Sequence, residues 1–195
     1  MEDKRVRKTK KNLKQTLIAL LEQKPFEQLS VTEICEAASS SRITFYTHYK
    51  DKYDLVEEIF RDMVELAAAD FRALQEENNP AGELTASYCN LLDSILNLYN
   101  DKSYFFAHTA VNPDPYLTFV SYQYILSSVE RYLDMTAGTP FRYTNRETAA
   151  FLCNGLGGFI DACRADRRPI DETREKAKAL LRSIIASGIL SGEGR

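Results

Sequence analysis

Residues 31 to 55 read VTEICEAASSSRITFYTHYKDKYDL, and this stretch decides the fold. Ser30 and Glu33 stand three residues apart, as in a capping box, where the two side chains satisfy free amides and start a helix at about Val31. Three consecutive serines, residues 39 to 41, then interrupt the apolar pattern, and hydroxyl groups at such a corner can cap a following helix. The stretch therefore predicts two short helices joined by a tight corner, which is a helix-turn-helix.

The second of these helices is expected over residues 42 to 49, with one face buried and the other exposed. Phe45 and Tyr49, four residues apart, lie on one side and can anchor the helix to a small core. Asp51 is expected to cap a third helix that begins near Lys52. The free amides of this helix start and the ammonium group of Lys52 would then lie beside a phosphate. The side chains left facing outward suit a groove of duplex DNA, and they are Arg42, Ile43, Tyr46 and Thr47.

Residues 44 to 55, TFYTHYKDKYDL, resemble the DNA-binding signature of the TetR (tetracycline-repressor) family of transcription regulators. The resemblance covers roughly residues 4 to 60 by motif, whereas the remainder agrees with the family in length and helical character. It implies that Arg42, Ile43 and Tyr46 face base edges. It also implies that mainly phosphates are contacted by Thr44, Thr47, His48 and Lys52. A further DNA contact on the preceding helix would be Thr32.

Two positions at the corner depart from the family pattern. The family usually has glycine where Ser39 stands and an aliphatic residue where Ser40 stands. A residue other than glycine costs roughly 1 kcal/mol in the left-handed region, which local hydrogen bonds or packing can offset. The departures therefore leave DNA binding possible.

Charge is distributed unevenly along the chain. Residues 1 to 52 carry 11 Lys and Arg against 7 Asp and Glu, net +4, and the remainder carries 14 against 21, net −7. Seven basic residues lie between Lys4 and Lys14 with no acidic residue among them. Such a segment is often a solvated terminus, but beside a helix-turn-helix it favours an arm that follows the phosphate backbone with salt-dependent affinity.

The rest of the chain predicts an all-α fold, because helical apolar patterns alternate with short breakers and no period-two alternation is sustained. We expect a helix-turn-helix domain over residues 1–51 and a helical effector-binding and dimerisation domain over 52–195, linked by a helix from about 52 to 75. The last two helices are expected near 145–165 and 171–188, and Gly155, Gly158 and Ala162 would let another helix approach closely. By resemblance, these two helices pair with their copies in a homodimer, which would suit a palindromic operator.

Other chemistries have weaker support. The sequence Gly-Leu-Gly-Gly at 155–158 follows no strand and lacks the spacing of a dinucleotide site. The four cysteines form no C-x-x-C pair, and the two histidines, His48 and His108, are far apart in the sequence. We therefore expect no metal, no cofactor and no catalytic residue. A redox-sensing cysteine stays open as an alternative. The longest apolar stretch is far below the ~20 residues that cross a bilayer, and no signal segment precedes the domain, so a cytoplasmic protein without a membrane span is expected.

These observations lead to one main hypothesis and two alternatives. The main one is a repressor that binds double-stranded DNA as a homodimer and leaves its operator when a small-molecule effector of unknown identity binds the second domain. Aromatic residues of that domain, including Tyr88 and Tyr124, could line an effector site, but such residues more often fill a core. The alternatives are a DNA-binding regulator controlled by a protein partner, or by no effector, and a helical-bundle enzyme acting on a small molecule.

Overall fold

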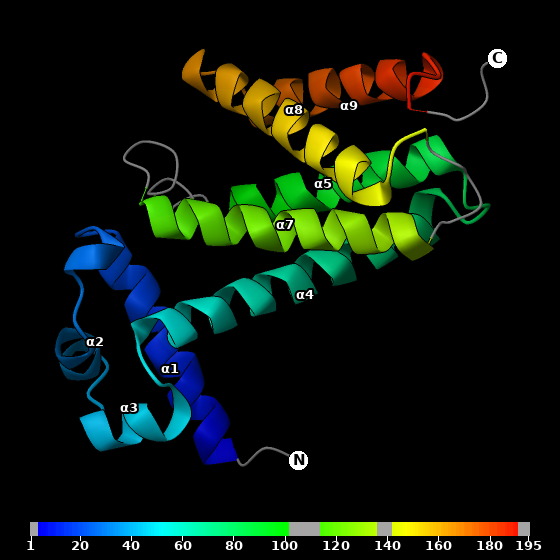
Figure 1. Ribbon diagram of the computed structural model, residues 1–195. Coiled ribbons are helices and arrows are strands. Elements are labelled where there is room, and N and C mark those ends of the chain that lie inside the picture. Colours follow the sequence, from blue (N-terminus) through cyan, green and yellow to red (C-terminus); the bar gives the residue numbers. More distant parts are fainter. Residues whose placement is uncertain (1–3, 102–113, 136–141, 191–195) are drawn as a thin grey trace. The chain divides into compact units, whose positions relative to one another are not determined.

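The computed structural model describes residues 4–101, 114–135 and 142–190, and every regular element in these ranges is a helix, as the sequence predicts (Figure 1). None of the described helices is long and apolar enough to cross a membrane. The helices are α1 (Lys4–Leu21), a short 3₁₀ helix η1 (Phe26–Gln28), α2 (Val31–Ala37), α3 (Arg42–His48), α4 (Lys52–Asn78), α5 (Leu84–Asp101), α7 (Pro115–Met135), α8 (Asn145–Ala165) and α9 (Ile170–Ala186).

The chain divides into two compact units that share two helices. The first unit consists of Met1–Met63 and Lys102–Ser121, and the second of Val64–Asp101 and Tyr122–Arg195, so α4 and α7 each contribute to both. This division differs from the expected boundary at residue 52. The first turns of α4 belong to the first unit, because Leu55, Val56 and Ile59 are buried there.

The core of the first unit begins with the apolar stripe of α1. Leu13, Leu17 and Leu21 recur every four residues and are all buried, so one face of the helix lies against its neighbours. The chain then turns at Pro25, and the buried Phe26 and Leu29 close the same core. An amphipathic first helix followed by a return of apolar residues is the arrangement that the sequence predicts.

The corner between α2 and α3 contains the backbone strain that the serine substitutions suggest. Ser39 has φ 49°, in the left-handed region that favours glycine. The Ser39 amide donates to the carbonyl of Glu36 (3.1 Å), and the Ser40 amide donates to the carbonyl of Cys35 (2.9 Å). This pair of bonds is the Schellman motif, which satisfies the last carbonyls of a helix and explains how a serine is held in this conformation.

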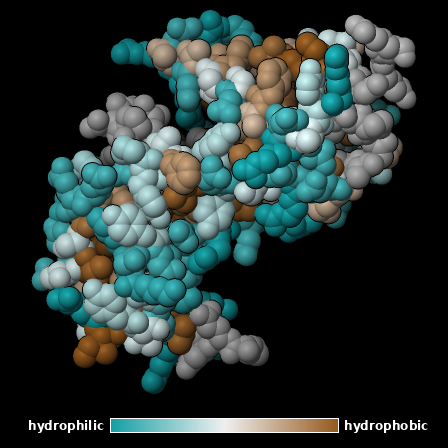
Figure 2. All heavy atoms as spheres, viewed as in Figure 1, coloured by the Kyte–Doolittle hydropathy of each residue, from teal (hydrophilic) through white to brown (hydrophobic). Residues whose placement is uncertain are grey.

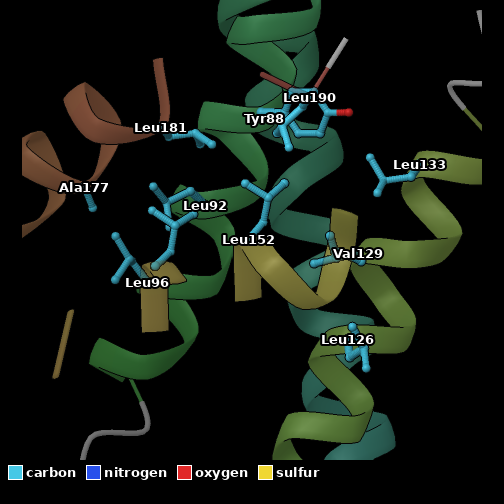
Figure 3. Packing of buried hydrophobic residues seen from close by; sticks show 12 residues of the cluster. Tyr88, Leu92, Leu96, Leu126, Val129, Leu133, Leu152, Ala177, Leu181 and Leu190 are labelled. Carbon is cyan, nitrogen blue, oxygen red and sulfur yellow. The ribbon is translucent and has the colours of Figure 1, made fainter. Parts of the chain in front are cut away.

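The second unit has its own apolar core, contributed by α5, α7, α8 and α9. Figure 3 shows Leu92 and Leu96 of α5 beside Leu152 of α8, with Leu181 of α9 next to them. Val129 and other buried residues of α7 belong to the same cluster. The helical periodicity predicted for these segments therefore corresponds to one contiguous core.

A charged seam crosses this unit between α5 and α9. The Asp93 carboxylate, almost fully buried, accepts a hydrogen bond from Arg174 (2.9 Å) and lies 2.6 Å from the ammonium nitrogen of Lys178. Arg174 also donates to the side-chain oxygen of Asn97 (2.7 Å), and Asn97 donates to Asp70 of α4 (2.8 Å). Three helices of the second unit are thus joined by a continuous polar chain.

The glycines of α8 are not needed for packing within the described part of the chain. A Cβ atom added at Gly155, Gly157 or Gly158 would meet no atom within 4 Å. The face they share with the exposed Ala162 is therefore open. The aromatic stretch 104–111 with His108, the sequences Asn-Pro at 112–113 and Gly-Thr-Pro at 138–140, and the side chain of Tyr99 lie outside the described residues.

Candidate nucleic-acid interface

The short helix α3 is fixed at its start by side-chain capping. Ser41 accepts a hydrogen bond from the amide of Thr44 (3.0 Å), so the third serine of the corner is the cap, as the sequence predicts. The preceding helix α2 starts with the predicted capping box, in which Ser30 and Glu33 exchange hydrogen bonds. Both short helices therefore owe their first turns to local sequence.

One face of α3 is buried and the other is open to solvent. Phe45 and Tyr49 are buried, as predicted, and their rings lie 5.6 Å apart. On the other side, Ile43 is 82% exposed and Tyr46 is 49% exposed, and Arg42 lies over the Tyr46 ring at 5.9 Å. Figure 2 shows hydrophobic surface over α3 beside hydrophilic residues. Apolar side chains are unfavourable in contact with water. The exposed isoleucine and tyrosine of this seven-residue helix therefore fit contact with a partner, such as the base edges of DNA.

The remaining predicted DNA contacts lie on or beside this face and differ in how exposed their side chains are. Thr32 and Thr47 are exposed, whereas Thr44 and His48 are half-buried. The Thr47 hydroxyl donates to the carbonyl of Ile43 (2.8 Å), and the Thr44 hydroxyl bonds to that of Ser41 (2.9 Å). A hydroxyl held in this way keeps oxygen lone pairs available, so each threonine can still accept or share a bond with DNA.

Lys52 has a different environment from the one that the sequence suggests. Its ammonium group donates to three backbone carbonyls, those of Phe26 (2.8 Å), Glu27 (3.0 Å) and Leu29 (2.9 Å). An ammonium has three donors, and all three are used here. Burial lowers the pKa of Lys52 although Asp114, Glu27 and Glu33 act in the opposite direction. This geometry argues against the predicted phosphate contact, because such a contact would leave the three carbonyls without this donor.

The basic amino-terminal segment is helical from Lys4, and two of its lysines are engaged within the first unit. Lys10 and Lys14 each lie 3.0 Å from a carboxylate oxygen of Glu58 on α4, and Lys14 also pairs with Asp62. Those pairs differ from the sequence interpretation, in which the whole segment follows the DNA backbone. Among the seven basic residues, Lys4, Arg7, Lys8 and Lys11 are exposed and remain candidates for that role.

Asn12 is a positioning residue that sequence analysis missed. Its side-chain amide donates to the carbonyl of Ala38 at 2.7 Å, at the carboxyl end of α2. The bond ties α1 to the corner just before Ser39. A lone asparagine on a helix gives no local signal of this role, because its partner lies 26 residues away.

The described residues contain no group of three or more His, Cys, Asp or Glu side chains arranged to hold a metal ion. The four cysteines are free thiols, and burial raises the pKa of Cys35, Cys89 and Cys153. A raised pKa lowers the thiolate fraction and with it the reactivity. The thiols of Cys35, Cys89 and Cys153 are therefore poorly suited to rapid redox sensing.

Residues 15–59, which contain the capped corner and α3, match the model of the family described as bacterial regulatory proteins, tetR family. This stretch of the chain therefore carries a DNA-binding domain of the TetR family type. A stretch of 53 residues is also 36% identical to YxbF of Bacillus subtilis (strain 168), an uncharacterized HTH-type transcriptional regulator. That match covers 27% of this chain but only 14% of YxbF, so the similarity to this relative is confined to a small part of its length.

The TetR-family fold extends over nearly the whole chain. A putative TetR-family transcriptional regulator from Syntrophomonas wolfei superposes with a TM-score of 0.72 over 94% of this chain and 97% of its own, at 13% identity. The flavonoid-responsive regulator FrrA gives a TM-score of 0.68 over 96% and 99%, at 14% identity. The family of the matched domain and both of these neighbours are described as regulators, and the likeness to the neighbours shows a shared fold.

Proposed function

We propose that this TetR-family protein is a sequence-specific DNA-binding repressor that recognises base edges with Arg42, Ile43 and Tyr46. The observation that supports this most directly is the exposed face of α3, a helix capped at its start and anchored by Phe45 on its other side. Base contacts from such a helix supply specificity, while Thr32, Thr44, Thr47 and His48 are the proposed backbone contacts. We expect the protein to act in the cytoplasm, where its duplex DNA target lies.

Selection of bound fragments from a random DNA pool tests this function. A half-site repeated with twofold symmetry is expected, and the selected operator then serves to measure affinity. The double variant Arg42→Ala plus Tyr46→Ala should lose about 1 to 3 kcal/mol for each base contact removed, which is roughly thirtyfold or more in affinity for the two together. Wild-type affinity in this variant would exclude these two residues as readers.

A matched control exists in the second unit. Arg142 and Tyr143 form the same kind of pair, with the guanidinium 5.9 Å from the ring centre, and Tyr143 is 46% exposed against 49% for Tyr46. Arg142→Ala plus Tyr143→Ala removes the same groups outside the helix-turn-helix. Operator affinity should stay at the wild-type value in this control.

We further propose that the protein acts as a homodimer through α8 and α9. The support is the open face of α8, where the Cβ positions of Gly155 and Gly158 meet nothing within the described chain and Phe151 is 54% exposed. Figure 2 shows hydrophobic residues at the surface over these two helices. A second copy would place a second α3 on the operator and double the number of bases read.

Substitution of the glycines tests the dimer without disturbing the protomer. Gly155 and Gly158 are exposed and a Cβ atom there would meet nothing within 4 Å, so leucine at both positions should be tolerated by the protomer and should improve helix propensity. The double variant should sediment as a monomer, whereas Gly157→Leu, on the neighbouring face, should stay dimeric. A dimeric double variant would exclude this face from the interface.

Control by a small molecule is the remaining part of the proposal. Two hydroxyls in the second unit, those of Tyr88 and Thr148, are buried and have no hydrogen-bond partner in the described part of the chain. A bound molecule with a hydrogen-bonding group would satisfy them. The FrrA neighbour is by name a flavonoid-responsive regulator, so a small molecule is a reasonable class to screen by thermal shift.

A screening hit should release operator DNA and should lose its effect when Tyr88→Phe and Thr148→Val are combined. Control by a protein partner is the alternative, and it would leave the whole compound screen without a hit. The two outcomes separate the small-molecule regulator from the partner-controlled one.

A further inference from the structure

Lys52 lies at the centre of an aromatic and carbonyl cage within the first unit. Besides its three carbonyl bonds, the ammonium nitrogen lies 4.6 Å from the ring centre of Phe26 and 5.4 Å from that of Tyr53. Cations bind to aromatic faces at such distances. The Phe26 carbonyl accepts from both the Leu29 amide and Lys52, so the lysine caps the carboxyl end of η1, where negative partial charge gathers.

The first turn of α7 contacts both aromatic rings of this cage. The Tyr116 ring stacks on Phe26, with centres 5.7 Å apart and planes 13° apart, and it meets the Tyr53 ring edge-on at 4.8 Å. Asp114 is buried, and its carboxylate accepts hydrogen bonds from the amides of Tyr116 (3.0 Å) and Leu117 (3.1 Å). The position of Tyr116 is therefore set by a capped helix start and is not free to drift.

The cage connects parts of the chain that the sequence separates widely. η1 leads through Leu29 and the Ser30 cap directly into α2, and Lys52 is the first residue of α4. α7 continues beyond Tyr116 to Leu126, Val129 and Leu133, which lie in the core of the second unit. Lys52 thus bonds to the segment that leads into the helix-turn-helix, and the two rings beside it contact a helix that also belongs to the other unit.

We propose that Lys52 is a positioning residue that joins the first turn of α7 to the DNA-reading helices, and that it makes no contact with the DNA backbone. This inference rests on the proposed DNA-binding function. Movement of the α7 start would change the support of η1 and so the position of α2 and α3. Operator affinity would then respond to Tyr116, a residue that is not itself among the proposed DNA contacts.

Salt dependence distinguishes positioning from phosphate contact. Loss of one phosphate contact lowers the slope of log affinity against log salt by about 0.9, whereas loss of positioning weakens binding with the slope unchanged. Lys52→Met should reduce operator affinity on the order of tenfold at unchanged slope and lower the Tm by about 5 °C. Lys50→Met, which removes an exposed charge two residues away, is the control and should leave the Tm unchanged.

Tyr116→Leu tests the α7 side of the joint while Lys52 keeps its charge. Operator affinity should fall several-fold, again with the wild-type salt slope. A fall in slope by about one unit for Lys52→Met with an unchanged Tm would overturn the proposal, and so would wild-type affinity and stability in both variants.

Amine labelling of the wild-type protein gives a test that does not depend on a variant folding. Reductive methylation followed by mass spectrometry should modify Lys52 much more slowly than Lys50 in the free protein, and operator DNA should not change the labelling of Lys52. Fast labelling of Lys52 that DNA suppresses would overturn the proposal. Failure of the wild-type protein to bind any DNA would instead refute the proposed function, while the labelling rates and the Tm of Lys52→Met would still decide whether the cage exists.

Discussion

Replacing Ser39 by glycine should stabilise the protein, because the serine is held in the left-handed region. At φ 49° a residue with a Cβ atom destabilises the folded state by roughly 1 to 2 kcal/mol, which glycine would relieve. Glycine also gives the unfolded chain more conformational freedom, and this offsets about 0.5 to 1 kcal/mol of the gain. The net gain is therefore about 0.5 to 1 kcal/mol. For a chain of 195 residues, each kcal/mol shifts the Tm by roughly 2–4 °C, so a rise of about 1 to 4 °C is expected.

Thermal unfolding at one fixed protein concentration measures this effect, since dimerisation would make the Tm depend on concentration. Ser39→Ala is the matched control, because alanine keeps the Cβ and its strain while removing the hydroxyl, and its Tm should stay close to that of the wild type. Arg167, at φ 56° after α8, has the same two bonds, from its own amide to Arg164 and from Arg168 to Cys163. Arg167→Gly should therefore also raise the Tm. Two glycine variants that melt at or below the wild-type temperature would refute the strain argument.

Three further outcomes follow from buried and capped side chains. Asp93→Asn should destabilise the second unit by about 3 kcal/mol in denaturant unfolding, because two nearly buried cations lose their carboxylate, and an unchanged midpoint would show that the charged seam is dispensable. Tyr88→Phe and Thr148→Val should each be neutral or stabilising by up to about 1 kcal/mol, since each removes a buried hydroxyl without a partner in the described chain; a marked loss would mean that the hydroxyl is bonded. Lys24 and the Ser30 cap lower the pKa of Glu33 to about 2, so the stability it adds is complete above about pH 4.5 and is lost as the pH falls toward 2. The Tm difference between wild type and Glu33→Gln should shrink over that range, and a difference that persists at pH 2 would contradict it.

The parts of the fold that the sequence predicts well are those fixed by neighbours along the chain. The Ser30 and Glu33 box and the Ser41 cap act over three residues, and the buried and exposed faces of α3 follow from helical spacing alone. The left-handed conformation of Ser39 is foreseen from the resemblance to the TetR family, which usually has glycine at this position. In each of these cases the decisive partner lies within one helical turn.

The parts that the sequence predicts poorly depend on partners brought together by the fold. Lys52 bonds to carbonyls 23 to 26 residues away, and Lys14 pairs with carboxylates more than 40 residues away. A lysine side chain is long and flexible, so its own sequence context cannot choose between a phosphate and an internal acceptor. The division into compact units near residue 63 has no local signal either, because α4 keeps one helical pattern across that position.

The distribution of charge in the first unit separates affinity from specificity. Lys10 and Lys14 pair with carboxylates of α4, and Lys52 bonds to backbone carbonyls. Three of the 11 Lys and Arg residues in the stretch 1–52 are therefore engaged within the first unit. On the outward face of α3 the cation is Arg42, whereas Ile43 and Tyr46 offer apolar and hydroxyl groups. An exposed isoleucine gains little from phosphates but can contact the methyl group of thymine, which differs between base pairs. The salt-dependent part of binding should therefore come from the exposed cations of α1, and the discrimination between sequences from a reading face that is mostly uncharged.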